Sequence, residues 1–334
     1  MIESAEFRNF KVLQDTTLLL GRFTLIVGPN NSGKSTALRA LQTFHNPRAF
    51  AFHEIVTAGL QDEEYVEVVL HWGAPYEGVI SRARWVPNEN RQSVHERPGS
   101  SLSDRDKQAL NVFLRRIRAY SLIATTLAAP VRLEPKVGLS EGGHNLVGVL
   151  DHLRDHEPER FEALNEEFGR WLPEFDRILF DTPETGRRVF LLRTREGQHP
   201  IQAADLSQGT LLALAVLTLA YLPDPPSMVC LEEPDRGIHP RLRRNVQDAL
   251  YRLSYPENFG EKRDPVQVVA TTHSPYFLDL YKDHPEEIVI AEKIGLYAQF
   301  ERLIDRPDIE EILEGAPLGE VWYSGVLGGV PREQ

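Results

Sequence analysis

The feature that most constrains this chain is a glycine-rich octapeptide at residues 28–35, with the sequence GPNNSGKS. It fits the pattern G-x-x-x-x-G-K-[ST], the P-loop, whose backbone N–H groups surround phosphate oxygens. Residues 23–27 form an apolar run typical of a buried strand, and residues 36–44 have the amphipathic spacing of a helix. A helix that begins at this loop directs its partial positive charge at the phosphates. The chain is therefore predicted to bind a nucleoside triphosphate.

Two residues of the octapeptide carry specific parts of that chemistry. Lys34 is expected to reach the β- and γ-phosphates, and the Ser35 hydroxyl to take one coordination position on Mg²⁺. The glycines let the backbone approach the phosphate oxygens closely.

The composition is that of an ordinary globular protein of 334 residues, 41% of them hydrophobic and 26% charged. The longest apolar run, residues 211–222, is shorter than the about 20 residues that span a bilayer, so it predicts a buried helix. A single cysteine, Cys230, excludes an internal disulfide and a cysteine-based metal cluster. The first residues have no apolar core of a signal peptide. We expect a cytoplasmic protein that makes no membrane contact.

The net charge of −12 at pH 7 argues against a surface coated with basic residues for nucleic acid. Arginines do gather locally, within residues 82–97, 115–118 and 241–244. Such clusters are more often solvated faces than binding sites. They leave contact with DNA or RNA as an open alternative.

Before and after the P-loop, short patterns predict an antiparallel lobe. Residues 1–20 suggest two strands. Residues 63–72 and 79–86 each alternate polar and apolar positions around a Pro-Tyr-Glu-Gly turn signal, which predicts a hairpin. Residues 88–103 are polar and are predicted to be an exposed loop.

The middle of the chain is predicted to be mainly helical. Residues 104–117, 145–155 and 158–171 have helical spacing. Residues 178–180 and 188–192 then resemble strands.

The sequence LSQGT at residues 206–210 precedes the long apolar run. Ser207 is a plausible N-cap for a helix over residues 211–221. On these residues alone, a capped core helix is as good an interpretation as a binding motif.

The apolar residues 228–231 predict a buried parallel strand that delivers Glu232 and Glu233 to its carboxyl end, where ligands bind in α/β sheets. Side chains alternate across a strand, so adjacent carboxylates can do separate work. One would hold Mg²⁺, usually through water, and the other would orient or deprotonate the attacking water.

Residues 266–270 predict another buried strand, which ends in TTHSP. A histidine beside a phosphate site can sense or stabilise the γ-phosphate charge. A lone histidine is more often structural, but His273 follows the third polar motif at a predicted strand end, which favours a functional role.

The order GPNNSGKS, LSQGT, CLEEPDRGIHP and TTHSP resembles the ABC-type ATPases of the SMC/RecF/OLD branch. It is most similar to the compact bacterial AAA-family ATPases of that branch, many of them encoded in anti-phage defence loci. Three softer motifs extend the resemblance over most of the chain: FRNFK at residues 7–11, EGGHNL at residues 141–146 and LGEVW at residues 318–322.

The resemblance implies an ATP and Mg²⁺ site. Glu232 would be the Walker B acid and a metal ligand together with Ser35, Glu233 the catalytic glutamate, and His273 the switch histidine. With the signature residues described next, the implied nucleotide contacts are Gly28, Asn30, Asn31, Ser32, Gly33, Lys34, Ser35 and Thr36.

The resemblance also implies a homodimer. Ser207 and Gly209 would form a signature that contacts the γ-phosphate bound to a second subunit, and residues 235–239 would line the interface.

The sequence departs from the family pattern at three points. Glu232 stands where most ABC proteins have Asp, although this branch often uses Glu, and Thr210 replaces the usual signature glutamine. The Mg²⁺-sensing glutamine has no motif of its own, and Gln61 is a trial assignment. These departures make nucleotide binding a firmer expectation than full hydrolysis.

The expected fold is α/β, with a P-loop NTPase core like that of ABC ATPases, an antiparallel β lobe and a helical insertion. Residues 1–103 would form the N-terminal ATPase lobe, residues 104–172 the insertion, and residues 173–334 the C-terminal lobe with signature, Walker B acid and switch histidine. The sequence has no heptad run for a coiled-coil arm, and the segment after the last motif is too short for a nuclease domain of the OLD type. We therefore expect any effector to be a separate protein.

The preferred function is ATP hydrolysis by an ATP-gated homodimer that serves an anti-phage defence or DNA-maintenance complex. The alternative is a non-hydrolysing nucleotide switch, a scaffold whose occupied state recruits an effector protein. A subunit that energises a membrane transporter fits less well, because the signature and Walker B variants do not suit it.

Overall fold

The computed structural model describes residues 1–45, 50–59, 65–87, 92–133, 138–184 and 186–328. The chain divides into two compact units. The first comprises Met1–Ala119, Pro226–Glu232 and Pro265–Gln334, and the second comprises Tyr120–Pro225 and Glu233–Asp264. Neither unit is a continuous stretch of sequence. The predicted boundaries after residues 103 and 172 stay a prediction.

The first unit is built on a six-stranded sheet of order β14-β13-β3-β12-β11-β7. Its central strands β3, β12 and β11 run parallel and are buried along their whole length. Such strands need apolar residues on both faces, which is why three short apolar runs predicted them correctly. The strands of this sheet are β3 (Phe23–Val27), β7 (Ile117–Tyr120), β11 (Met228–Leu231), β12 (Gln267–Thr272), β13 (Ile288–Ile294) and β14 (Tyr297–Arg302).

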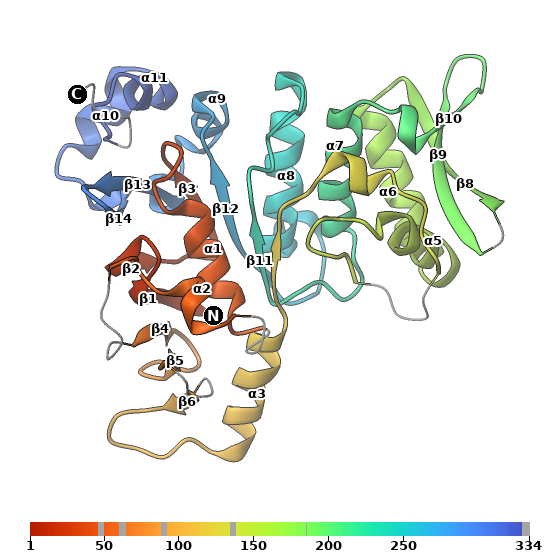
Figure 1. The fold of residues 1–334 in the computed structure, drawn as a ribbon. Coiled ribbons are helices and arrows are strands. Elements are labelled where there is room, and N and C mark those ends of the chain that lie inside the picture. Colours follow the sequence, from red (N-terminus) through yellow and green to blue (C-terminus); the bar gives the residue numbers. More distant parts are fainter. Residues whose placement is uncertain (46–49, 60–64, 88–91, 134–137, 185, 329–334) are drawn as a thin grey trace. The chain divides into compact units, whose positions relative to one another are not determined.

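A five-stranded antiparallel sheet of order β2-β1-β4-β5-β6 belongs to the same unit (Figure 1). The two predicted strands ahead of the P-loop strand are present, and the predicted hairpin is confirmed as the antiparallel pair β4 and β5. Its strands are β1 (Ile2–Phe10), β2 (Leu13–Leu19), β4 (Val66–Trp72), β5 (Ile80–Trp85) and β6 (Gln92–Glu96).

The expectation of an exposed loop over residues 88–103 is wrong for Gln92–Glu96, which pair with β5 as strand β6. This segment is polar and mostly exposed, so burial does not make it a strand. The segment is a strand because it pairs with β5, and a hydrogen bond of 2.8 Å between His95 Nδ1 and Ser81 Oγ supports this pairing. A polar stretch of sequence indicates neither the strand with which it will pair nor the side-chain hydrogen bond that it will make.

Helix α1 (Lys34–Gln42) packs its apolar residues Leu38 and Leu41 into the core of the first unit, together with Phe7 and Phe10 of β1. The helix was expected over residues 36–44. It begins two residues earlier, because Gly33 serves as its N-cap. Further helices of this unit are α2 (Phe52–Ile55), α3 (Asp104–Arg115), α9 (Pro275–Leu278), α10 (Ile309–Gly315) and α11 (Leu318–Tyr323).

The second unit surrounds helix α7 (Gln208–Ala220), which is buried on every side from Thr210 onward. It packs against α4, α6 and α8. A helix without a polar face belongs in such a position, so the predicted buried helix is confirmed. Other elements of this unit are α4 (Ala124–Leu127), α5 (Leu146–His156), α6 (Pro158–Trp171), α8 (Arg243–Ser254), β8 (Phe175–Glu184), β9 (Arg187–Thr194) and β10 (Pro200–Gln202).

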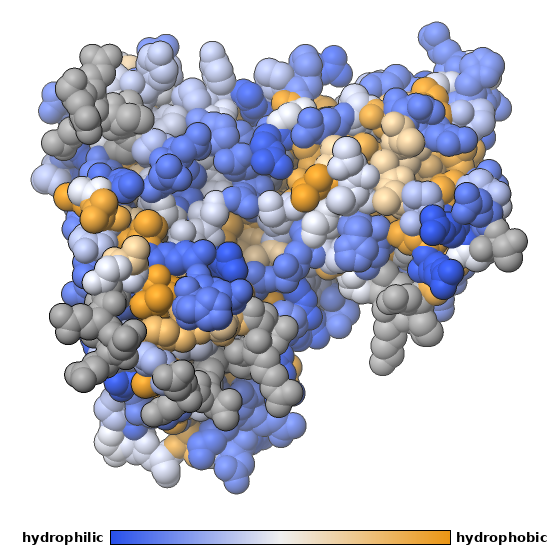
Figure 2. Space-filling model, viewed as in Figure 1, coloured by the Kyte–Doolittle hydropathy of each residue, from blue (hydrophilic) through white to orange (hydrophobic). Residues whose placement is uncertain are grey.

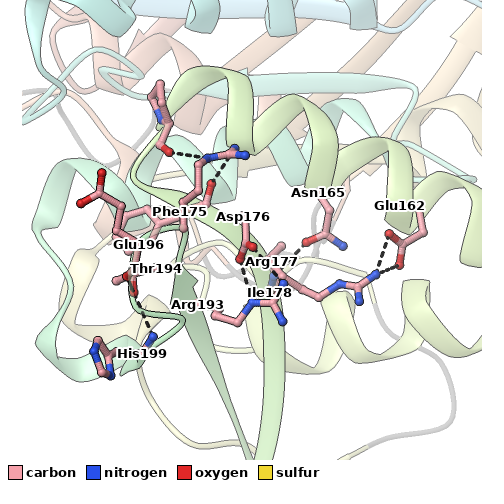
Figure 3. A network of polar contacts seen from close by, with 12 residues as sticks. Glu162, Asn165, Phe175, Asp176, Arg177, Ile178, Arg193, Thr194, Glu196 and His199 are labelled. Atoms are coloured by element: carbon pink, nitrogen blue, oxygen red, sulfur yellow. Dashed lines mark hydrogen bonds and ion pairs between the residues drawn. The ribbon is translucent and has the colours of Figure 1, made fainter.

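Polar contacts fasten the β8–β9 hairpin to α6 (Figure 3). Asn165 of α6 accepts a hydrogen bond of 2.9 Å from the Ile178 N–H of β8. Across the hairpin, the Arg193 guanidinium donates to both carboxylate oxygens of Asp176, at 2.8 and 2.9 Å. This guanidinium holds the pKa of the Asp176 carboxyl below its usual range.

Apolar side chains are exposed where β13 turns into β14, and Figure 2 shows hydrophobic residues over β14 at the margin of the first unit. They include Ile294, Leu296 and Tyr297. Ala291 and Ala298 of the same hairpin are buried, so the hairpin has one face in the core. Across the described part of the chain, no helix is long and apolar enough to cross a membrane.

Candidate nucleotide-binding site

Three predicted motifs of the first unit follow neighbouring parallel strands. The P-loop follows β3, Glu232 follows β11 and His273 follows β12, and β12 lies between the other two. The register aligns the strand ends, since Thr272 pairs with Val27 and Leu231 with Ala270. The carboxyl ends of parallel strands meet at one edge of a sheet. The fold therefore brings Lys34, Glu232 and His273 to the same edge.

The P-loop leads into α1 without a side-chain cap. Its N-cap is Gly33, at φ 91°, and no side chain bonds the first amides of the helix. The first N–H groups of a helix have no partner within the helix. A glycine cap therefore presents backbone donors and the positive end of the helix dipole to an anion.

The Lys34 side chain folds back onto the backbone of the P-loop. Its side chain is 6% exposed, and Nζ donates to the carbonyl oxygens of Gly28 at 2.7 Å and Pro29 at 2.8 Å. A buried ammonium group is costly unless its charge is compensated. The two carbonyls hold this cation in the centre of the loop, where a phosphate would provide a charged acceptor instead.

The glycines of the loop are required by what lies behind them. A Cβ on Gly28 would lie 2.3 Å from the Ala291 carbonyl oxygen of β13, and a Cβ on Gly33 would lie 2.6 Å from Ala298 Cβ of β14. Real Cβ contacts are not that short, so only glycine fits. The β13–β14 hairpin is therefore part of the site, although the sequence interpretation did not include it.

The FRNFK motif leads into a segment that contacts the hairpin behind the P-loop. Asn9, near the end of β1, and Lys11, in the turn between β1 and β2, adopt positive φ angles of 57° and 52°. Directly after this turn, the Val12 carbonyl accepts a hydrogen bond of 2.8 Å from the Ala298 N–H. The motif thus helps fix the hairpin that backs the P-loop.

Three oxygen-bearing side chains, Ser32, Ser35 and Glu232, are suited to hold ATP and Mg²⁺ at this site. Ser32 Oγ is buried and has no hydrogen-bond partner among the residues that the structure describes, so it can donate to a phosphate oxygen. The Ser35 hydroxyl donates to Glu232 Oε1. The two oxygens therefore face each other, and Mg²⁺ prefers oxygen ligands of this kind.

The remaining P-loop residues are accessible. Asn30 and Asn31 are exposed, with Asn31 at φ 63°, and Thr36 is half-buried in the first turn of α1. Gln61, the trial Mg²⁺-sensing residue, lies outside the described residues.

Glu233 does not continue the alternation of β11, because the strand ends at Leu231. Its backbone is left-handed, with φ 45°, a conformation that costs a non-glycine residue about 1–3 kcal/mol. Such strain clusters at functional sites. In the second unit, its carboxylate lies 3.9 Å from Arg236 Nη1.

His273 is the first residue after β12 and is exposed. The next residue fixes the chain on either side of it: the Ser274 N–H donates to Thr272 Oγ1 at 3.0 Å, and Ser274 Oγ caps α9 through the Phe277 N–H. A short strand end and a capped helix therefore hold the histidine between them.

The predicted N-cap at Ser207 is confirmed in the second unit. Ser207 Oγ accepts from the Thr210 N–H at 3.1 Å and lies 2.8 Å from Thr210 Oγ1. Thr210, the departure from the usual signature glutamine, thus shares a hydroxyl contact with the cap. Gly209 packs against the next motif, since a Cβ there would lie 2.7 Å from the Gly237 carbonyl oxygen.

A pocket of about 680 Å³ opens beside this helix start, entirely within the second unit. It joins the signature to the segment after Glu233 and to the end of α6. Its lining residues are Trp171, Leu172, Glu174, Ser207, Gln208, Gly209, Thr210, Gly237, Ile238, His239, Arg241 and Leu242.

Comparison with known protein families finds two matches that together reach from residue 1 to residue 279. Residues 74–279 match the family described as "AAA domain, putative AbiEii toxin, Type IV TA system". Residues 1–94 match the family described as "AAA ATPase domain".

A curated protein with a similar sequence is an OLD nuclease of Thermus scotoductus, 25% identical over 353 aligned residues. The alignment covers 87% of this chain and 64% of the nuclease. This chain therefore spans less than two thirds of the length of that relative.

Solved structures of SMC heads share the fold. An SMC head bound to the C-winged helix domain of ScpA gives a TM-score of 0.62 at 17% identity, over 90% of this chain and 96% of that chain. An SMC head with an extended coiled coil, derived from Pyrococcus furiosus and bound to the C-terminal domain of ScpA, gives 0.60 at 16% identity, over 90% and 95%. The predicted fold class, an α/β P-loop ATPase core with an antiparallel lobe, is confirmed.

Proposed function

We propose a function from the family: the chain belongs to the AAA-domain family that residues 74–279 match and to the ABC-type ATPases of the SMC/RecF/OLD branch. In this proposal the protein binds ATP with Mg²⁺ and hydrolyses the nucleotide to ADP and phosphate. The observation that carries this proposal is the meeting of P-loop, Glu232 and His273 at the ends of three adjacent parallel strands.

Binding would begin from the contacts that the P-loop already makes. Lys34 would exchange its two carbonyl acceptors for phosphate oxygens, which form stronger, charge-assisted hydrogen bonds. The buried Ser32 hydroxyl would donate to another phosphate oxygen. Ser35 and Glu232 would hold Mg²⁺, which neutralises phosphate charge when bound.

Hydrolysis would need a base and a group that responds to the γ-phosphate. Glu233 directly follows the Walker B acid, and we assign it to orient the attacking water and accept its proton. His273, at the end of the strand beside the P-loop strand, would donate a hydrogen bond to the γ-phosphate oxygens. Both roles come from the resemblance and from strand-end placement.

We further propose that two copies close over ATP. In ABC-type ATPases the signature serves the nucleotide of a second subunit, and the confirmed cap at Ser207 starts a buried 13-residue helix whose N-terminus favours an anion. The adjoining pocket brings the signature and residues 237–242 to one surface. ATP would favour closure, because ADP has no γ-phosphate for this helix to contact.

The biological setting that we propose is an anti-phage defence or DNA-maintenance complex with a separate effector protein. The similar OLD protein is a nuclease, and the similar SMC heads are bound to domains of ScpA. We therefore propose that this ATPase acts together with another protein or with DNA.

The decisive experiment is ATP turnover by the wild type and by Glu233→Gln, with ATP affinity measured on the same preparations. Glu233→Gln keeps the shape of the side chain but removes the base. We expect phosphate release to fall at least about 100-fold, in keeping with the contribution of a general base, while ATP affinity persists. Glu159→Gln, which neutralises an exposed residue in the first turn of α6, is the matched control. ATP binding without phosphate release by the wild type would favour the non-hydrolysing switch.

A further inference from the structure

The LGEVW motif near the C-terminus forms helix α11, and this helix lies against α9, the short helix that follows His273 (Figure 1). Leu318 and Trp322 are buried at 2% and 7% exposure, so one face of α11 is a packing face. The structure thus gives a location to a motif that the proposed nucleotide chemistry leaves unused.

The approach between the two helices is close enough to require glycine. A Cβ on Gly319 would lie 2.5 Å from the Pro275 carbonyl oxygen and 2.8 Å from Pro275 Cβ. Pro275 is the first residue of α9 and stands two positions after His273. An ordinary carbon–oxygen contact is about 3.3 Å, so any larger residue at 319 must part the two backbones by about 0.8 Å.

A hydrogen bond fixes the register of this contact. The Gly319 N–H donates to Asp279 Oδ1 at 2.7 Å, and Asp279 directly follows α9. Gly319 is in the first turn of α11, where backbone N–H groups have no partner within the helix. Asp279 therefore caps α11 at the C-terminal end of α9, and the contact of Gly319 with Pro275 holds α11 at the N-terminal end of α9.

Helix α9 is in turn connected to the P-loop strand. Phe277 lies edge-on to Tyr281, with ring centroids 5.4 Å apart, and Tyr281 stacks on Phe23 at 5.1 Å. Phe23 is the first residue of β3. These contacts anchor the far end of α9, whereas the end next to His273 is covered by α11.

We propose that α11 is a positioning element for His273, seated on α9 by Gly319 and Asp279. This inference rests on the proposed role of His273 at the γ-phosphate. If α11 is displaced, Pro275 loses its cover and the histidine two residues away loses its fixed position. A misplacement of about 1 Å in such a group can cost as much as about 100-fold in rate.

The test compares Gly319→Ala with Gly315→Ala. Gly315 is the last residue of α10, four positions before Gly319, and a Cβ there would meet no atom within 4 Å. We expect Gly319→Ala to lower kcat for ATP hydrolysis at least about fivefold with KM for ATP within about twofold, and Gly315→Ala to leave both unchanged. In a His273→Ala background, Gly319→Ala should cost less than about twofold, because the residue that it positions is gone. An equal loss of kcat in both backgrounds would overturn the proposal.

Asp279 supplies the milder pair of variants, in case Gly319→Ala does not fold. Asp279→Ala removes the acceptor for the Gly319 N–H, whereas Asp279→Asn keeps a carbonyl oxygen there. We expect the alanine variant to lose kcat and the asparagine variant to recover most of it. Loss in both variants, or in neither, would contradict the seating role of this carboxylate.

A second measurement separates this inference from the proposed function. In protein labelled with ¹³C-histidine, the resonance that His273→Ala removes should shift in Gly319→Ala and stay in place in Gly315→Ala. If the wild type binds ATP without hydrolysing it, the proposed ATPase fails, and this shift still decides whether α11 positions His273. An unchanged resonance would refute the positioning role.

Discussion

Replacing Ser207 separates a structural cap from a nucleotide contact, because the chain offers a matched cap elsewhere. Ser207 Oγ accepts from the Thr210 N–H at 3.1 Å, and Ser103 Oγ accepts from the Asp106 N–H at the same distance at the start of α3. Loss of a serine cap costs about 1 kcal/mol. Loss of the cap alone should therefore lower the free energy of unfolding of both alanine variants by about that amount.

The environment of Ser207 adds a second cost. Thr210 is 7% exposed and its hydroxyl contacts Ser207 Oγ at 2.8 Å, so Ser207→Ala leaves a nearly buried hydroxyl with one partner fewer. A lost partner of this kind costs about 1 kcal/mol. Ser103 Oγ also donates to Asp106 Oδ2 at 2.7 Å, but this pair is exposed, so water replaces the lost partner. We expect about 2 kcal/mol for Ser207→Ala and about 1 kcal/mol for Ser103→Ala, measured by urea unfolding.

The activities should differ far more than the stabilities. A hydrogen bond from Ser207 to the γ-phosphate is a bond to a charged group, which contributes about 1.5–3 kcal/mol, or about 10- to 150-fold in rate. Ser207→Ala should lose that much ATP turnover, and Ser103→Ala none. Ser207→Asp should keep the cap and its stability but lose turnover, because its charge repels the phosphate. Equal turnover in the two alanine variants, or an active Ser207→Asp, would refute the assignment of Ser207.

Two further predictions concern titratable groups. Burial raises the pKa of the Cys230 thiol on β11 to about 12, so Ellman's reagent at pH 8 should label it only after unfolding, and rapid labelling of the native protein would contradict the buried strand. Because the Arg193 guanidinium lowers the pKa of Asp176 in the folded state, the stability that this pair contributes is present at neutral pH and is lost as the pH falls through the folded pKa, below the ordinary aspartate value of about 3.9. Asp176→Asn should therefore make the free energy of unfolding depend less steeply on pH in the acid range. An unchanged pH dependence would count against the pair.

The sequence predicted best those elements whose own residues, by apolar pattern or by a capping side chain, determine their structure. β3 and β11 are short apolar runs buried on both sides, and α7 is an apolar helix with a serine cap. In each case burial and local hydrogen bonding follow from the residues of the element itself. The contact of Ser35 with Glu232 likewise follows once both motifs are placed at strand ends.

The parts that sequence missed depend on partners far along the chain. β6 is a strand because β5 pairs with it. The β13–β14 hairpin was not predicted, and its place behind Gly28 and Gly33 depends on strand order, which no local pattern states. Glu233 was expected to follow strand alternation, whereas the strand ends at Leu231 and Glu233 turns to a left-handed conformation. The LGEVW motif was noticed, but its partner α9 was not.

In the proposed dimer, two copies close around ATP, with the P-loop of one facing the signature of the other. The substitutions Asn30→Cys, exposed on the P-loop, and Gln208→Cys, beside Ser207, would report this contact by crosslinking in a Glu233→Gln background. The native Cys230 is buried and should not compete. Crosslinked dimers should form with ATP and Mg²⁺ and be scarce with ADP. Equal crosslinking with the two nucleotides would contradict the ATP-gated dimer.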